Sequence, residues 1–234
     1  MDKKNILHKV IRKHDDYIDI GIDEAGRGPV LGYMVFGAVV SSEVIKYKDS
    51  KLLTPSQRET SFKAIQENNN LSHIYFALHP SYITTEMQNK SLNEISYIAQ
   101  INIIKCLEHL KIRNVYLDIV GPVSTHQKRL KTIFPNLNFI IEEKADSKYG
   151  IVGAASIVAK VTRDKRLLNW KFKDNNYGSG YPSDPETIKW LDRNFNPLFG
   201  YSDIVRFKWS TIERRLGIRK SKNVSSLGFY ADFD

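Results

Sequence analysis

Cysteine is almost absent from this chain of 234 residues, because Cys106 is the only one. A single thiol cannot form an internal disulfide, and its apolar neighbours predict a buried structural side chain. The six histidines are scattered, and no Cys/His cluster has the spacing of zinc ligands. The sequence therefore indicates neither a disulfide framework nor a zinc-centred fold.

Long hydrophobic runs are also missing. No apolar stretch approaches the roughly 20 residues of a membrane-spanning helix, and the N-terminal segment has no apolar centre of a secretory signal. We therefore expect an intracellular, soluble protein that does not engage a membrane. The compartment would be the nucleus in a eukaryote and the cytoplasm otherwise.

The composition is that of a globular protein, with 41% hydrophobic and 11% aromatic residues. The length fits one larger domain, or a domain with a small appendage. The formal net charge of +9 suits a polyanionic partner, since phosphates are bound by Lys and Arg. A protein that is basic without binding nucleic acid remains an alternative at this point.

Apolar periodicity predicts an α/β domain around a mixed sheet. Two apolar segments joined by a glycine-rich turn, 17–23 and 33–40, are typical of a central hairpin. Thr54 followed by Pro55 predicts the N-terminus of a helix. Further strands are expected at 71–78, 115–120 and 139–141, and further helices at 91–110, 151–168 and about 184–195.

Four acidic residues are placed where strands end or a helix is about to begin: Asp23, Glu24, Asp118 and Asp146. Carboxylates at the ends of neighbouring strands can converge, and carboxylate oxygens are the ligands that Mg²⁺ and Mn²⁺ prefer. Taken singly, each could be a turn residue or a helix cap. Asp23 and Asp118 lie within otherwise apolar strands, where an unpaired carboxylate is costly. The sequence therefore leaves two interpretations of these residues, a shared metal site or separate turn and capping roles.

The segment 21–32, GIDEAGRGPVLG, resembles the signature of type 2 ribonucleases H. Tyr33, just after it, departs from the proline that the family often has. The form GSGYPSDP at 178–185 is most similar to the catalytic subunit of the eukaryotic heterotrimeric enzyme or its archaeal relatives. Further matching blocks follow in the family's order at 49–51, 118–122, 144–147, 154–164 and 205–211.

The resemblance implies a ribonuclease H-like fold, with a central mixed β-sheet flanked by helices and a C-terminal helical extension. The implied organisation is a loosely ordered N-terminus (1–16), a catalytic domain (17–177), a helical extension (178–219) and a tail (220–234). The implied activity is hydrolysis of RNA in RNA–DNA hybrids, and cutting on the 5′ side of single ribonucleotides in duplex DNA.

The resemblance also assigns roles to residues. Two Mg²⁺ or Mn²⁺ ions would be held by the four carboxylates, Asp23, Glu24, Asp118 and Asp146. Backbone groups of Gly26, Arg27 and Gly28 would read the ribose 2′-hydroxyl, and Tyr181 would pack on the sugar at the RNA–DNA junction. Lys51, Lys160 and Arg163 would lie near substrate phosphates. Each of these roles has a structural alternative. The segment 26–28 could be an ordinary glycine turn, Tyr181 a packing aromatic, and Lys160 with Arg163 a solvated basic face.

Partners and rival functions follow from the same resemblance. Two accessory subunits could dock on the apolar segment 225–230, although this segment could equally fold back on its own domain. A non-catalytic hybrid-binding module is one rival, and a nuclease of the same fold that acts on DNA alone is another. A catalytic subunit that is inactive without its partners is a third.

Overall fold

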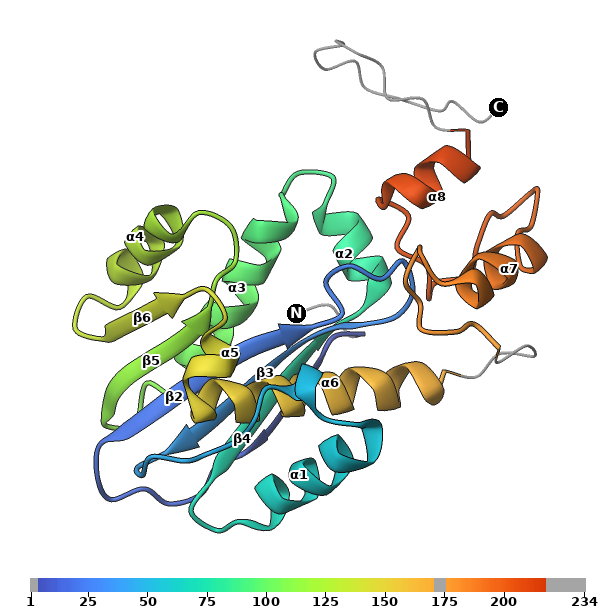
Figure 1. Ribbon diagram of the computed structural model, residues 1–234. Coiled ribbons are helices and arrows are strands. Elements are labelled where there is room, and N and C mark those ends of the chain that lie inside the picture. The colour runs from blue at the N-terminus through green and yellow to red at the C-terminus, as the bar shows by residue number, and fades with distance from the viewer. Residues whose placement is uncertain (1–3, 171–175, 218–234) are drawn as a thin grey trace.

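A computed structural model describes residues 4–170 and 176–217, and its centre is a six-stranded sheet (Figure 1). The strand order is β1-β4-β3-β2-β5-β6, with β1 to β4 antiparallel and with β5 and β6 parallel to β2. The predicted α/β class and mixed sheet are confirmed. The strands are β1 Ile6–Val10, β2 Ile18–Ala25, β3 Met34–Ser41, β4 Ser72–Leu78, β5 Ile112–Asp118 and β6 Asn138–Glu142.

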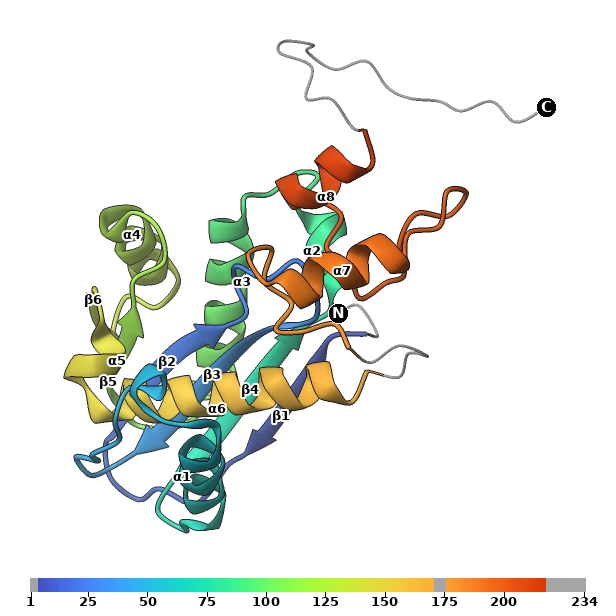
Figure 2. The same ribbon diagram turned by 45° about the vertical axis from the view of Figure 1, so that its right-hand side comes forward.

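Helices cover both faces of the sheet (Figures 1 and 2). On one face α1 and α6 pack in one hydrophobic cluster, and on the other α3 and α4 pack in a second. The helical segments are η1 Ser50–Leu52, α1 Pro55–Glu67, α2 Pro80–Glu86, α3 Leu92–Lys105, α4 Val123–Ile133, α5 Ala145–Lys148, α6 Gly150–Leu168, α7 Pro185–Arg193 and α8 Ser210–Arg215. Within the described part of the chain, no helix has both the length and the apolar character needed to cross a bilayer.

Local sequence explains where two of these helices begin. Thr54 and Gln57 form a capping box at the start of α1, with Pro55 in the first turn, as predicted. Ser91 and Glu94 form a second capping box at the start of α3. The helix expected over 91–110 ends earlier, at Lys105, and a turn then leads into β5.

Helix α6 lies unusually close to the centre of the sheet. A Cβ on Gly21 would be 2.4 Å from the carbonyl oxygen of Ile151, and one on Gly37 would be 2.4 Å from that of Ala155. Only residues without a side chain allow this approach of helix to strands. It brings Ser156 and Lys160 of α6 beside the C-terminal end of β2.

The N-terminal segment differs from expectation. Residues 1–16 were expected to be loosely ordered, but Ile6–Val10 forms β1 and pairs with β4, with Ile6 opposite Ala77. This corrects the prediction for these residues. The physical reason is that β1 is an edge strand, held by main-chain pairing with β4, so its charged and polar side chains do not prevent its formation.

The C-terminal part packs against the glycine-rich loop that follows β2. Leu31 forms a β-bridge with Val205, and Val30 joins Trp190 and Ile212 in a third hydrophobic cluster. Figure 1 shows α7 and α8 beside this end of the sheet. The predicted tail 220–234, including the apolar segment 225–230, lies outside the described residues.

Candidate active site

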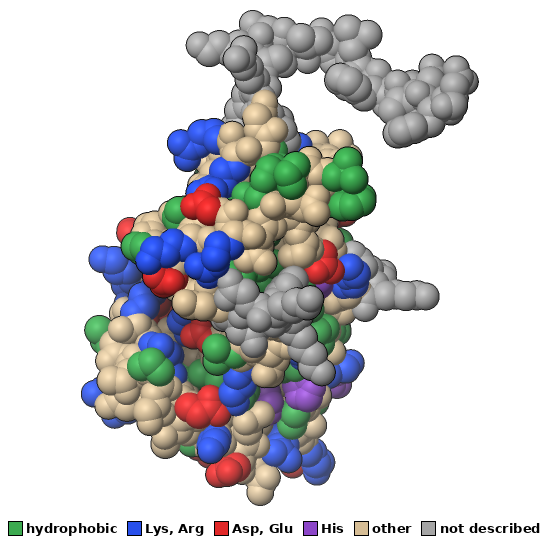
Figure 3. Space-filling view, turned by 90° about the vertical axis from the view of Figure 1, so that its right-hand side faces the viewer, with side chains coloured by type: hydrophobic (Ala, Val, Ile, Leu, Met, Phe, Trp, Pro, Cys, Tyr) green, Lys and Arg blue, Asp and Glu red, His purple; other side chains and the backbone are tan. Residues whose placement is uncertain are grey.

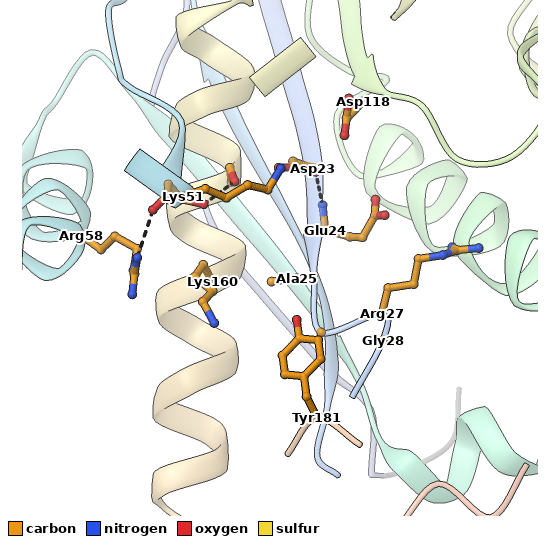
Figure 4. A pocket seen from close by; sticks show the side chains of 13 residues that line it. Asp23, Glu24, Ala25, Arg27, Gly28, Lys51, Arg58, Asp118, Lys160 and Tyr181 are labelled. Atoms are coloured by element: carbon orange, nitrogen blue, oxygen red, sulfur yellow. Dashed lines mark hydrogen bonds between the residues drawn. The ribbon is translucent and has the colours of Figure 1, made fainter. Parts of the chain in front are cut away.

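A pocket of about 270 Å³ opens where β2 and β5 end. Nine of the eleven residues singled out in the sequence line it, while Asp146 and Arg163 do not. The close-up in Figure 4 shows side chains from β2, η1, α6 and the loop at Tyr181 around one space. The nine are Asp23, Glu24, Gly26, Arg27, Gly28, Lys51, Asp118, Lys160 and Tyr181.

Strand register brings the first three carboxylates together. Asp23 and Glu24 lie on β2, and Asp118 is the last residue of β5. Because β2 and β5 are parallel, with Ile22 opposite Leu117, Asp23 and Asp118 come next on adjoining strands. Asp118 accepts a hydrogen bond from the Ala145 amide at 3.0 Å.

Asp146 is held at the border of this pocket. It lies on α5, just after β6, and is only 2% exposed. Its Oδ2 accepts a hydrogen bond from Lys51 Nζ at 2.8 Å, and Lys51 itself lines the pocket. Asp146 is thus linked to the pocket through Lys51.

The carboxyl groups are costly to ionise. Burial, and then the neighbouring Glu24 charge, raise the pKa of Asp23 well above its usual range, although the Ser156 hydroxyl donates a hydrogen bond to it. Burial raises the pKa of Glu24 to about 7, with Asp118 adding to the effect and Arg27 opposing it. Burial also raises the pKa of Asp118.

The donor set fits hard divalent cations. Oε2 of Glu24 and Oδ1 of Asp146 are buried without a hydrogen-bond partner, and unpaired carboxylate oxygens are suited to Mg²⁺ or Mn²⁺. Among the described residues, no three acidic, His or Cys side chains meet closely enough to enclose an ion as they are placed. The fit rests on the chemistry and on the unpaired oxygens.

The glycine loop has an unusually bare surface. Gly26 has a φ of +82°, and a Cβ there would be 2.7 Å from the Tyr33 carbonyl oxygen. The Arg27 side chain turns away from the pocket and donates to Ser96 Oγ at 2.6 Å and to Asn93 Oδ1 (Figure 4). The amides of Gly26, Arg27 and Gly28 donate to no acceptor among the described residues.

Tyr181 closes the side of the pocket next to this loop. Tyr181 is 38% exposed, and its Cε1 would be 3.3 Å from a Cβ on Gly28. A flat aromatic surface therefore stands beside the exposed backbone of Gly28. This is the surface against which a sugar could pack.

Arg163 lies behind Tyr181 and not in the pocket. Its guanidinium is 5.9 Å from the Tyr181 ring centroid and donates to the Ser179 carbonyl at 2.8 Å and to Asp164 at 3.1 Å. It is 3% exposed, which differs from the predicted place near a substrate phosphate. Lys160, one turn earlier on α6, lines the pocket, and Asp164 pairs with it at 3.0 Å.

Sequence reasoning missed several residues at this site. Arg58 of α1 lines the pocket and donates to the carbonyls of Ser50 and Leu53. Ser156 lies over Asp23 and hydrogen-bonds Ser50 at 2.8 Å. Their positions depend on the packing of α1, η1 and α6, so no local pattern marks them. Ser156 does fall within the longest family-like block, which was the one available signal.

Comparison with known proteins agrees with this geometry. The family model described as Ribonuclease HII matches residues 20–212. A ribonuclease H2 subunit of Caenorhabditis elegans is 42% identical over 217 residues, covering 82% of this chain and 72% of the relative. The corresponding Homo sapiens protein is 37% identical over 212 residues, covering 83% and 71%.

Solved structures show the same fold. The crystal structure of the ribonuclease H2 from Pyrococcus horikoshii OT3 is 34% identical, with a TM-score of 0.73, and 86% of this chain and 97% of that chain are covered. A Bst-RNase HIII in complex with Mn²⁺ has a TM-score of 0.67 at 17% identity, with 86% and 70% covered, and supports the fold alone. The ribonuclease H-like fold implied by the sequence is confirmed, and the chain belongs to the ribonuclease HII family.

Proposed function

We propose that this protein is an endonuclease that cuts RNA in RNA–DNA hybrids and cuts duplex DNA on the 5′ side of a single embedded ribonucleotide. The products are a 3′-hydroxyl and a 5′-phosphate. The observation that carries the proposal is one pocket in which acidic side chains adjoin a bare glycine backbone and an exposed tyrosine. Membership of the ribonuclease HII family, and relatives named as ribonuclease H2 subunits, support it.

Asp23, Glu24, Asp118 and Asp146 would hold two Mg²⁺ or Mn²⁺ ions. Such ions, when bound, activate water and stabilise the leaving oxygen in phosphodiester hydrolysis. The chain's own contribution is burial of the Glu24 carboxyl group, which raises its pKa to about 7, with the nearby Asp118 and Asp146 charges adding to the effect. A cation bound there would relieve this cost. A protein that only binds hybrids gains nothing from this negative charge beside a phosphate.

Basic side chains around the pocket bind the backbone. Lys51, Arg58 and Lys160 come from three different helical segments and line the same space. Phosphate contacts of this kind set the position of the duplex without reading its sequence. They offset the repulsion between the acidic pocket and the substrate.

Recognition of ribose falls to the glycine loop and Tyr181. The unpaired amides of 26–28 can donate to a 2′-hydroxyl, the group that distinguishes RNA from DNA. Tyr181 stands next to Gly28, so a sugar held by the loop would pack on its ring. A nuclease that acts on DNA alone would have no use for this pair of features.

The test compares two duplexes that differ in one oxygen atom. Purified protein is incubated with a labelled DNA duplex carrying one ribonucleotide, or with its all-DNA counterpart, in Mg²⁺ or in EDTA. Cleavage of the first duplex in Mg²⁺ only supports the proposal. Tight binding of hybrids without cleavage, both alone and with accessory chains, would make the protein a binding module.

We also infer that the chain works with accessory subunits, because its relatives are named as one subunit of an enzyme. Phe195, Leu198 and Phe199 offer a docking surface near α7, with Leu198 81% and Phe199 79% exposed. Figure 3 shows hydrophobic side chains gathered in the upper part of this face.

The proposed cellular location of the protein is the compartment in which the genome is replicated, which is the nucleus in a eukaryote and the cytoplasm otherwise.

A further inference from the structure

Arg206 is a fully buried arginine in the segment that leads into α8. Its Nε donates to the Gly32 carbonyl at 2.9 Å and its Nη1 to the Arg27 carbonyl at 3.4 Å. Its guanidinium lies 4.8 Å from the ring centroid of Trp209. Its hydrogen bonds thus end on both sides of the glycine loop.

This placement has a cost. Arg206 pairs with no carboxylate among the described residues, and its Nη2 has no hydrogen-bond partner. Burial, with the nearby Arg163 charge, lowers the pKa of Arg206 to about 9. A buried charge without a counter-ion is destabilising, so the contacts it makes with the loop call for a functional reason.

Trp209 reaches the same loop from the same segment. Its indole Nε1 donates to the Gly28 carbonyl at 3.0 Å. The carbonyl of Arg27 and the carbonyl of Gly28 belong to the two peptide planes on either side of the Gly28 Cα. Arg206 and Trp209 therefore hold both planes around one glycine.

Peptide geometry then sets the direction of the Gly28 amide. In a trans peptide the N–H points opposite to the preceding carbonyl, and the described residues contain no cis bond. The Arg27 carbonyl points inward to buried Arg206, so the Gly28 N–H points outward. Gly28 is exposed, lines the pocket, and its amide has no acceptor among the described residues.

The main chain of the segment that carries Arg206 is itself bonded to the glycine loop. The Arg206 amide donates to the Val30 carbonyl at 2.9 Å, and the Gly32 amide donates to the Ile204 carbonyl at 2.9 Å. Leu31 and Val205 form the β-bridge between these segments. The loop and the segment that holds it therefore form one rigid unit, which is what precise orientation of a donor needs.

We propose that Arg206 and Trp209 are positioning residues that set ribonucleotide specificity, by presenting the Gly28 amide to the ribose 2′-hydroxyl. This inference rests on the proposed function and assigns part of its specificity to the C-terminal segment. Neither side chain needs to touch the substrate, because each acts through a carbonyl of the loop.

The test uses Trp209→Phe, which keeps an aromatic ring beside Arg206 and removes the indole donor. In an Asp118→Asn background, dissociation constants in Mg²⁺ are measured for a duplex with one ribonucleotide and for its all-DNA counterpart. We expect the preference for the ribonucleotide to fall roughly three- to tenfold, with all-DNA affinity unchanged. Arg206→Lys, which cannot donate to both carbonyls in the same way, should lower the preference too.

Tyr177→Phe is the matched control, because it also removes one donor to a main-chain carbonyl, that of Leu167, outside the loop. Tyr177→Phe should keep the full preference for the ribonucleotide-containing duplex, at a melting temperature similar to that of Trp209→Phe. Unchanged preference in Trp209→Phe and Arg206→Lys, or equal weakening for both duplexes, would overturn the inference. If Trp209→Phe does not fold, Arg206→Lys decides. A parent protein that shows no preference at all would instead overturn the ribose reading in the proposed function.

Discussion

Asp23 and Glu24 are neighbours on β2, and both carboxyl groups are buried beside further acidic side chains. Within the metal-free protein this is an unfavourable arrangement, since each charge opposes the next. The cost is understandable if the pocket is built to bind cations and substrate. Stability and activity should therefore respond in opposite directions to the loss of one charge.

Asp23→Asn tests this opposition. Removing the buried charge should raise the free energy of unfolding of the metal-free protein at pH 8 by about 1–2 kcal/mol, and should lower cleavage at least ~100-fold because a metal ligand is lost. Asp19→Asn is the matched control on the same strand: Asp19 pairs with Arg113 at 2.7 Å, so its loss should destabilise by about 1 kcal/mol and leave cleavage intact. Denaturant melts and single-turnover cleavage measure both. Lower stability in Asp23→Asn would contradict the account.

The pKa of Glu24, near 7 instead of the ordinary 4.5, gives a pH prediction. The folded state holds a proton on Glu24 that the unfolded state has lost, so the Glu24 contribution to stability falls as pH rises from about 4.5 to 7. The difference in free energy of unfolding between wild type and Glu24→Gln, measured without metal, isolates this effect. It should grow in favour of the variant across that window, and a flat difference would contradict it.

The same linkage predicts how metal acts. A cation competes with the proton for Glu24, so Mg²⁺ should raise the melting temperature more at pH 8 than at pH 5.5. Thermal melts with and without Mg²⁺ at both pH values measure this. In Glu24→Gln the pH dependence of the Mg²⁺ effect should shrink.

Some residues of the site could be predicted from the sequence, and the placement of others could not. Asp23, Glu24 and Asp118 could be picked out because charged residues in apolar strands are locally conspicuous. Arg163 and Lys160 looked alike in sequence, three apart on one helix, but α6 turns Lys160 into the pocket and buries Arg163 behind Tyr181. A difference of this kind depends on what packs against the helix, which local sequence does not carry.

At the scale of elements, the contact between α6 and the sheet places the basic side of the pocket. Gly21 and Gly37 allow the helix axis close to β2 and β3, so the helix carries Ser156 over Asp23. Apolar periodicity predicted strands β2 to β6 and the long helices α3 and α6. Edge strand β1 and amphipathic helix α4 were missed, since each has a polar face and depends on the sheet for its stability.

A pair of glycine substitutions separates the role of this packing from the role of the loop. Gly37→Ala places a Cβ 2.4 Å from the Ala155 carbonyl and should destabilise the protein by about 2 kcal/mol or more. Gly28→Ala meets only the Tyr181 ring at 3.3 Å. Its melting temperature should stay close to wild type, while cleavage of ribonucleotide-containing duplex falls. The reverse pattern would contradict both assignments.

At the scale of the whole molecule, the site is completed by two segments far apart in sequence. The glycine loop after β2 is bonded to the 204–206 segment and to the Gly180 carbonyl, so the C-terminal part holds Tyr181 and the loop together. The family-like blocks at 178–185 and 205–211 indicated that these segments contribute to the site, but they did not show that these segments bond to the glycine loop. These hydrogen bonds could not be predicted, because they join main-chain groups, which are the same in every sequence.

The exposed hydrophobic side chains near α7 give a prediction for assembly. Leu198→Asp with Phe199→Asp should abolish co-purification with the accessory chains, since a charge is costly in an apolar interface. The melting temperature of the isolated protein should not change, because both side chains are already exposed. Lys208→Asp, an exposed charge change on the segment before α8, serves as the control. Normal assembly of the double variant would show that the interface with the accessory chains lies elsewhere on the protein.

The most direct test of the account maps the cut itself. A DNA duplex with one ribonucleotide, labelled at both ends, is incubated in Mg²⁺ with wild-type protein or with Asp118→Asn, together with accessory chains where these are needed. The account predicts a single cut on the 5′ side of the ribonucleotide with a 3′-hydroxyl and a 5′-phosphate, lost in Asp118→Asn. Cleavage of the all-DNA duplex, a cut elsewhere, or full activity in Asp118→Asn would contradict it.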